Sequence, residues 1–147
     1  MLALQEMSDR LEIQDLTVRY AHAVDTHQWD LLDDLFTPDA HIDFSATGAP
    51  TGGLAGLKEF LAQVLPNFVA HQHFLSNWSI TVDGDTAAVR TMCHNPMVVA
   101  DQEGRQTLMQ YGLWYVDDLR RVDGRWRIAR REQEKSYAFV GSSAVGP

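Results

Sequence analysis

The chain has 147 residues, of which 45% are hydrophobic and 22% charged, and its formal net charge is −8. This length suffices for one domain with a sizeable core. The acidic balance disfavours nucleic acid as a partner, because phosphate contacts need a basic patch. No run approaches the roughly 18 apolar residues of a membrane span, and the one cysteine, Cys93, excludes an internal disulfide. We therefore expect a cytoplasmic protein that binds neither nucleic acid nor membrane.

The first part of the chain predicts three helices and a short strand. Apolar residues recur at helical spacing from Ile13 to Val24, and Ser8 or Asp9 can cap the start of this helix. Polar residues separate it from a second, shorter helix, and Pro66 ends a third helix. The second helix, the strand and the third helix are expected at residues 29–36, 40–45 and 54–65.

The remainder of the chain predicts two antiparallel hairpins. The turns "DGD" and "VDG" each join two long segments rich in strand-forming residues. The four strands are expected at residues 68–82, 86–100, 105–121 and 125–137. Helices followed by an antiparallel meander indicate an α+β fold, in which a curved sheet and the covering helices enclose a pocket. We expect one domain over residues 1–135 and a glycine- and serine-rich tail over 136–147.

Asp25 and the two histidines of "HQH", His71 and His73, are candidates for chemistry. Asp25 stands at the polar join between two predicted helices, where a carboxylate also serves as an N-cap. The histidines share one face of a predicted strand, so alternation alone does not choose between them. Neither histidine has an acidic or cysteine neighbour at a spacing typical of zinc sites, so we predict no metal. No glycine-rich nucleotide-binding motif is present, and we predict no cofactor.

Three phrases carry a resemblance to a known superfamily: "IQDLTVRYAHAVDTHQWDLLDDLFTPDAHIDF", "HQHFLSNW" and "VDGRWRIARRE". With the order of elements, they resemble the SnoaL-like, or nuclear transport factor 2-like, superfamily over residues 8–135. The resemblance implies a cone-shaped α+β domain, with three N-terminal helices on the concave side of a curved antiparallel sheet. Within it, scytalone dehydratase, bile-acid 7α-dehydratase and hexachlorocyclohexane dehydrochlorinase are cofactor-free lyases. They share an aspartate that ends the first helix and a histidine on the first long strand, which correspond to Asp25 and His73.

The bile-acid dehydratase pattern adds a tyrosine five residues before the aspartate and an arginine on the last strand. Tyr20 matches the tyrosine, and Arg131 is the candidate for the arginine. Arg130 is the alternative, because a bulge would reverse which of the two side chains points inward. The resemblance implies that His73 removes a proton from carbon while Asp25 orients it and stabilises the imidazolium. Tyr20 would then assist a departing oxygen and Arg131 would stabilise negative charge.

The implied function is that of a dehydratase-like lyase or isomerase acting on a small apolar cyclic molecule. The residues expected to bind this substrate are Phe44, Phe60, Leu75, Asn77, His94, Met109 and Trp114. One geometric condition applies to the catalytic set. At ~100° per residue, Tyr20 and Asp25 lie ~140° apart on a regular helix, so both reach one pocket only if the helix ends or loosens before Asp25.

Two other functions are compatible with the same residues. A SnoaL-like polyketide cyclase would use the same acid–base pair to form an enolate for carbon–carbon bond formation. A ligand-binding module, or an accessory subunit like the small subunit of ring-hydroxylating dioxygenases, would need no catalytic pair. We also expect a homo-oligomer, a trimer or a dimer, because Trp114, Tyr115 and Trp126 are predicted to place apolar surface on the outer face of the sheet.

Overall fold

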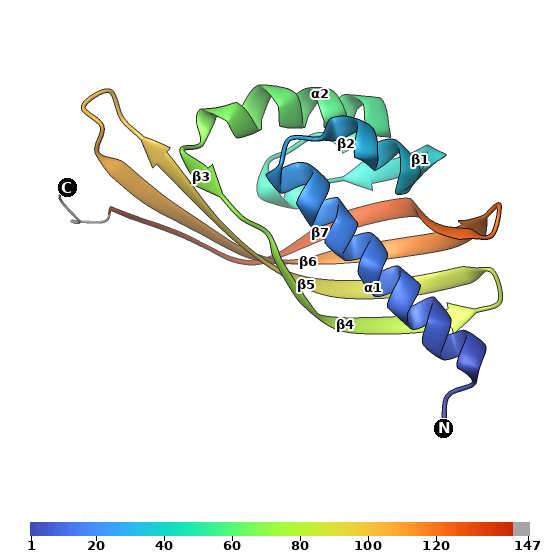
Figure 1. The fold of residues 1–147 in the computed structure, drawn as a ribbon. Coiled ribbons are helices and arrows are strands. Elements are labelled where there is room, and N and C mark those ends of the chain that lie inside the picture. The colour runs from blue at the N-terminus through green and yellow to red at the C-terminus, as the bar shows by residue number, and fades with distance from the viewer. Residues whose placement is uncertain (143–147) are drawn as a thin grey trace.

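The computed structural model describes residues 1–142 and has an α+β fold. Figure 1 shows one long helix lying across the concave side of a strongly curved sheet, and a second helix packed above the first two strands. In chain order the elements are α1 (Leu4–Asp25), η1 (Trp29–Asp34), β1 (Phe36–Asp43), η2 (Ser45–Thr47), β2 (Thr51–Gly52), α2 (Leu54–Val64), η3 (Leu65–Asn67), β3 (Ala70–His71), β4 (Phe74–Asp83), β5 (Thr86–Ala100), β6 (Gln106–Val122) and β7 (Arg125–Ser142). The expected fold class, with three helices preceding the long strands, is confirmed.

The sheet has the strand order β2-β1-β7-β6-β5-β3, and β4 also pairs with β5. Its four long strands are antiparallel neighbours, as expected from the two hairpin turns. β1 instead runs parallel to β7, which makes the sheet mixed. β1 also begins at Phe36, earlier than predicted, and Pro38 falls where the pairing with β7 shifts register between Phe36 and His41. A proline is tolerated there because it has no N–H to donate to a ladder.

Helix α1 starts at Leu4 with Ala3 as its N-cap, so the predicted capping by Ser8 or Asp9 is wrong. Asp9 is buried and serves another purpose. Its carboxylate accepts a hydrogen bond from Arg121 at 2.6 Å and lies 3.4 Å from the indole nitrogen of Trp126, which fastens α1 to the sheet. Within residues 1–142, neither α-helix has the length and apolar character that crossing a membrane requires.

Strand β4 changes the face it presents at Asn77. This residue has a φ of 51°, and the pairing with β5 shifts register between Ser76 and Ser79. Asparagine tolerates this left-handed conformation better than most residues. The extra residue reverses the alternation. Phe74, which precedes Asn77, is exposed, whereas Trp78, which follows it, packs against the core.

The outer face of the sheet differs from the prediction. Tyr115 and Trp126 belong to the buried core and are 1% and 4% exposed, so their predicted place on the outer face is wrong. Only Trp114 lies outside, and the guanidinium of Arg90 covers its ring at 4.0 Å. Tyr115 points inward because it lies two residues after Leu113 on the same face of β6, and Leu113 also packs in the core.

The last strand is longer than expected. β7 continues to Ser142 and pairs with β6 as far as the Thr107–Ser142 pair, so residues 136–142 of the predicted tail belong to the sheet. In Figure 1, β5, β6 and β7 extend together well beyond the helices. The rest of the predicted tail, residues 143–147, lies outside the described residues.

Candidate active site

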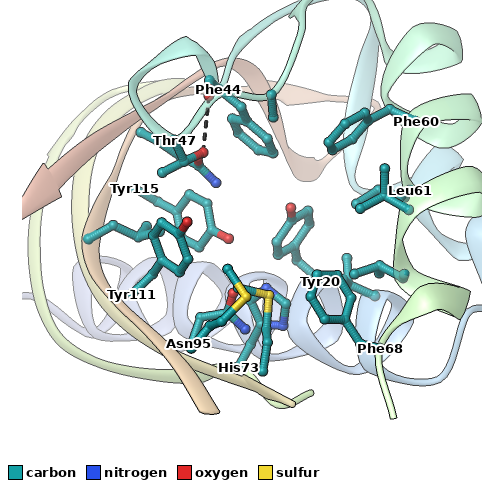
Figure 2. Close-up of a pocket in the computed structure, with 18 residues that line it drawn as sticks. Tyr20, Phe44, Thr47, Phe60, Leu61, Phe68, His73, Asn95, Tyr111 and Tyr115 are labelled. Carbon is teal, nitrogen blue, oxygen red and sulfur yellow. Dashed lines mark hydrogen bonds between the residues drawn. The ribbon is translucent and has the colours of Figure 1, made fainter. Parts of the chain in front are cut away.

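A cavity of about 190 Å³ lies between the helices and the inner face of the sheet. Its wall is mostly apolar. The apolar side chains come from α1, α2, the sheet and the links between these elements, and include Val24, Phe44, Phe60, Leu61, Phe68 and Met109. A few polar groups interrupt this wall, namely Tyr20, Thr47, His73, Asn95, Tyr111, Tyr115 and Gln133. Figure 2 shows the aromatic and apolar side chains surrounding the central space, with His73 at one end of it. An apolar cavity with few polar groups is typical of a small-molecule site.

Asp25 and His73 are in direct contact. Nδ1 of His73 lies 2.7 Å from Oδ1 of Asp25, and the backbone N–H of His73 donates to Oδ2 at 2.9 Å. Asp25 is the last residue of α1, and His73 lies in the short link between β3 and β4. The end of the helix therefore fixes both the imidazole ring and the backbone of the residue that carries it.

The two residues lie on different sides of the cavity wall. His73 lines the cavity, whereas Asp25 lines a separate surface hollow behind it, beside His71 and Pro96. The helix stays regular through Asp25, so the expected loosening before that residue does not occur. It is not needed either, because Tyr20 faces the cavity directly and Asp25 reaches it through His73.

The charge on Asp25 determines which nitrogen of His73 carries a proton. Burial pushes the pKa of Asp25 upward, but the hydrogen bonds and charge of His73 outweigh burial and hold that pKa below its ordinary value. An ionised carboxylate only accepts hydrogen bonds, so Nδ1 of His73 is the donor. Within residues 1–142, Nε2 of His73 has no hydrogen-bond partner, which leaves its lone pair available to a molecule in the cavity.

Two tyrosines place hydroxyl groups in the same cavity. Figure 2 shows the hydroxyls of Tyr20 and Tyr115 directed into the central space. Their rings pack edge to face, with centroids 5.6 Å apart. Burial raises the pKa of both tyrosines, although the nearby charge of Arg131 opposes this for each. Both are therefore neutral phenols at neutral pH and can donate hydrogen bonds to an oxygen on a bound molecule.

Arg131 lies inside the protein, whereas Arg130 is at the surface beside Glu132. Arg131 does not line the cavity. Its Nε and Nη2 atoms each donate to Asp117 at 2.7 Å, and its guanidinium carbon lies 4.1 Å from the ring centroid of Tyr20 and 4.3 Å from that of Tyr115. Burial lowers the pKa of Arg131, but the carboxylate of Asp117 more than offsets this and leaves it raised. Arg131 therefore contacts two cavity-lining tyrosine rings and not the cavity itself.

Three of the residues predicted to bind a substrate line the cavity, namely Phe44, Phe60 and Met109. Leu75 packs against the core but does not line the cavity.

The other three predicted binding residues lie elsewhere because of strand parity. Asn77 is exposed at the register shift of β4. His94 is hydrogen-bonded to the Tyr137 hydroxyl at 2.9 Å, and Trp114 lies under Arg90 on the outer face. None of these three residues lines the cavity.

Tyr115, Tyr111 and Asn95 also line the cavity, although they were not predicted to do so. Alternation along β6 was the available signal, because Tyr111 and Tyr115 lie an even number of residues from Met109 and share its face. Trp114 lies an odd number from Met109, so the two could not both point inward without a bulge between them. Asn95 lies two residues after Cys93 and shares its inward face of β5. Burial raises the pKa of the Cys93 thiol to about 12.

His71 is a second imidazole on the same carboxylate. Its Nδ1 lies 3.3 Å from Oδ1 of Asp25. The possible ligand atoms of Asp25, His71 and His73 all lie within 4.8 Å of one another, so the fold brings together an acidic partner that the sequence spacing did not reveal. Two ligands of a tetrahedral zinc ion would stand about 3.4 Å apart, whereas His73 and Asp25 are separated by 2.7 Å. The present geometry is that of hydrogen bonding, and the absence of a metal stays a prediction.

The chain matches known proteins over nearly its whole length. The sequence model of the SnoaL-like domain matches residues 5–132. An uncharacterised protein of Mycobacterium tuberculosis is 49% identical over 137 residues, which covers 93% of this chain and 92% of the relative. A Novosphingobium aromaticivorans protein, provisionally called an aromatic ring hydroxylase, is 34% identical with a TM-score of 0.79, covering 93% of this chain and 94% of that chain.

One more solved structure is informative about the fold alone. The hexachlorocyclohexane dehydrochlorinase of Novosphingobium barchaimii superposes with a TM-score of 0.78 over 98% of this chain and 99% of that chain. Its sequence is 21% identical to this one. The two solved structures share the curved α+β fold of this chain.

Proposed function

The chain belongs to the SnoaL-like family, and from this membership we propose that it is a cofactor-independent lyase or isomerase of dehydratase type. In this proposal His73 removes a proton from carbon in a small, largely apolar ring compound. The observation that carries the proposal is the 2.7 Å contact between Nδ1 of His73 and Oδ1 of Asp25 at the wall of an apolar cavity.

The proposed proton transfer uses the free nitrogen of His73. Nε2 takes the proton from carbon, and the electron pair of the broken C–H bond forms a double bond as a leaving group departs from the neighbouring carbon. Asp25 keeps the opposite nitrogen protonated and stabilises the imidazolium that forms. A neutral imidazole suits this task because its ordinary pKa lies near physiological pH.

Tyr20 and Tyr115 are proposed to stabilise the oxygen atoms of the substrate. Both are neutral donors that face the cavity, and a donor aimed at an oxygen that gains negative charge lowers the barrier of the reaction. Arg131 takes part through the tyrosines, because a cation against an aromatic face favours the build-up of negative charge on the phenol oxygen.

The size of the cavity limits the substrate. A cavity of about 150 Å³ holds benzene, so the 190 Å³ here suits a single six-membered ring with one or two small substituents. Asn95, Tyr111 and Gln133 are the remaining polar groups that could select substituents.

A suitable probe reaction is the conversion of 3-hydroxycyclohexanone to cyclohexenone and water. The base takes the proton next to the carbonyl, and the hydroxyl leaves with a proton supplied through a tyrosine. We expect the wild-type protein to accelerate this loss of water and His73→Ala to be slower by about 10²–10⁴-fold, the usual contribution of a general base. Equal rates for the two proteins, followed by product absorbance, would remove the proposed role of His73.

Two alternatives use the same fold. A polyketide cyclase would use the same base to form an enolate, and mass spectrometry would then detect carbon–carbon bond formation without loss of water. An accessory subunit is favoured by the 34% identical relative provisionally called an aromatic ring hydroxylase. Purification of the tagged protein from its native host would then yield a larger partner chain in a fixed ratio.

We also propose that the protein self-associates as a dimer or a trimer. Phe74, Tyr137 and Phe139 are each about half exposed. Phe74 and Tyr137 lie in one row across the sheet. Phe74 pairs with His94, His94 pairs with Gly112, and Gly112 pairs with Tyr137. Phe139 shares the face of Tyr137 two residues along β7. Light scattering should give a mass above that of one chain for wild type and a lower mass for Phe139→Glu, and a monomeric wild type would contradict this.

A further inference from the structure

Two more histidines continue the line of contacts from His73 toward solvent. Oδ1 of Asp25 is shared by Nδ1 of His73 at 2.7 Å and Nδ1 of His71 at 3.3 Å. The other nitrogen of His71, Nε2, lies 2.9 Å from Nε2 of His27. The side chain of His71 is only 6% exposed, whereas His27 is at the surface. The four groups connect the cavity wall to the outside of the molecule.

His27 stands where a helix normally ends in glycine. Its φ is 56°, and the N–H of Gln28 donates to the carbonyl of Ala23 at 2.8 Å. This is the six-to-one hydrogen bond, which spans five residues, of a Schellman helix end. A side chain in this left-handed conformation is unfavourable relative to glycine. Here its ring lies nearly parallel to that of His71, with centroids 5.2 Å apart and an interplanar angle of 3°, and the Trp29 ring stacks on it at 5.2 Å.

The contacts determine the position of each proton. Asp25 is ionised and only accepts hydrogen bonds, so His71 must donate from Nδ1. Burial lowers the pKa of His71 despite the opposing charge of Asp25, so the ring is neutral at neutral pH and its Nε2 is an acceptor. The 2.9 Å contact then requires His27 to donate from Nε2. One set of tautomers satisfies all these contacts.

We propose that His71, held in its tautomer by His27, is a positioning residue for the base His73. This inference rests on the proposed function of the Asp25–His73 pair. As a neutral donor, His71 anchors Asp25 at the distance that His73 requires. When His71 is protonated at acidic pH, its positive charge competes for the carboxylate that must stabilise the His73 imidazolium, and the base is weakened.

The surroundings of His71 contain few other charges. The titratable groups that face it are Asp25 from α1, His73 from the link before β4, and His27 from the turn after α1. The remaining residues of the adjoining hollow are uncharged, namely Ala70, Gln72, Pro96 and Val98. Among the described residues, the protonation of His71 therefore depends mainly on the groups of this cluster.

Nitrogen-15 NMR of the imidazole rings tests the proposal without a substrate. At pH 7.5 we expect the Nδ1–H tautomer for His71 and the Nε2–H tautomer for His27, as the contacts require. As the pH is lowered, protonation of His71 should shift the His73 ring signals in wild type, and this response should be absent in His71→Asn, because the asparagine amide replaces the donor but cannot be protonated. An Nε2–H tautomer for His71, or the same response of the His73 signals to pH in the two proteins, would overturn the proposal.

His27→Gly separates positioning from folding. Glycine removes the imidazole and relieves the left-handed conformation, so the melting temperature should not fall. The tautomer preference of His71 should nevertheless be lost. His22→Ala, at an exposed position of α1, is the matched control and should leave the His71 and His73 spectra unchanged. A His27→Gly protein with the wild-type His71 tautomer would contradict the role of His27.

Turnover of the probe distinguishes this inference from the proposed function. His71→Ala should lower kcat about threefold to tenfold with KM unchanged, because one long hydrogen bond to a charged group is lost. If His73→Ala loses activity while His71→Ala keeps the wild-type kcat and pH profile, only the positioning role fails. If His73→Ala keeps full activity, the proposed function fails, and the NMR result still decides the structure of the cluster.

Discussion

Two carboxylates near the cavity, Asp117 and Asp25, are used in opposite ways. Asp117 is 1% exposed and gives both oxygens to the single guanidinium of Arg131, at 2.7 Å each. Asp25 has a side chain that is 22% exposed and divides its oxygens among two imidazoles and a backbone N–H. The partner of Asp117 is always charged, whereas the side-chain partners of Asp25 are imidazoles, whose ordinary pKa lies near neutral pH.

From this difference we expect the first pair to be structural and the second to be the one that takes part in the proposed reaction. The Arg131–Asp117 pair is sealed from solvent, and both oxygens of the carboxylate accept hydrogen bonds from the guanidinium. It supports the rings of Tyr20 and Tyr115 from behind. The Asp25–His73 pair lies beside the cavity, and the His73 side chain lines its wall. We expect changes to the first pair to act on stability and changes to the second to act on turnover.

The largest effect on stability is expected from Asp117→Ala. The substitution leaves the guanidinium of Arg131 buried without a counter-charge, and removing one partner of a buried pair typically costs about 3–5 kcal/mol. Denaturant unfolding followed by circular dichroism measures this loss. Arg130→Ala, at an exposed pair with Glu132, is the control and should change the unfolding free energy by less than about 1 kcal/mol. Equal effects of the two substitutions would contradict the distinction.

Asp25→Asn should slow turnover of the probe by about 10²-fold while the far-ultraviolet circular dichroism stays unchanged. The amide has nearly the shape of the carboxylate, but it carries no charge to stabilise the imidazolium and no longer fixes the tautomer of His73. Initial rates at saturating substrate give the comparison. An Asp25→Asn protein that unfolds before losing activity would show that Asp25, like Asp117, is mainly structural.

Tyr115→Phe should reduce kcat by about tenfold, because one donor to the substrate oxygen is lost while the ring against Arg131 remains. Tyr20→Phe should have a similar effect for the same reason. Tyr137→Phe is the matched control, since that hydroxyl is bonded to His94 away from the cavity. A Tyr115→Phe protein with wild-type kcat would leave Tyr20 as the single phenol involved.

The sequence predicted most of the fold because its local signals agree with the final structure. The "DGD" and "VDG" turns give the antiparallel order of the long strands, and the apolar spacing of α1 gives the helix that crosses them. The parallel pairing of β1 with β7 was missed because it joins segments about 90 residues apart and has no local signature. The start of α1 was missed because Asp9 forms a long-range ion pair with Arg121 instead of a cap.

Alternation predicted the facing of a side chain only within uninterrupted strands. It failed for Asn77, where a positive φ inserts an extra residue into β4. The resemblance to known lyases supplied the Asp25–His73 pair, because residues 48 apart leave no periodic signal of contact. It did not supply His71 and His27, whose contact depends on the exact end of α1. These side chains needed the tertiary structure.

The smallest effect is expected in the pH dependence of stability. The pKa of His71 is lowered in the folded state by burial, relative to an ordinary value of 6.5. Below pH 6.5 the unfolded chain therefore binds a proton at this residue that the folded protein does not, and the folded state loses stability as the pH falls. In His71→Asn this contribution is absent, so the unfolding free energy should decline less steeply between pH 7 and pH 5 than in wild type. The difference in slope cannot exceed about 1.4 kcal/mol per pH unit for one proton. Parallel curves from urea unfolding at several pH values would show that His71 titrates alike in the folded and unfolded states, and that its burial in the cluster around Asp25 does not couple stability to pH.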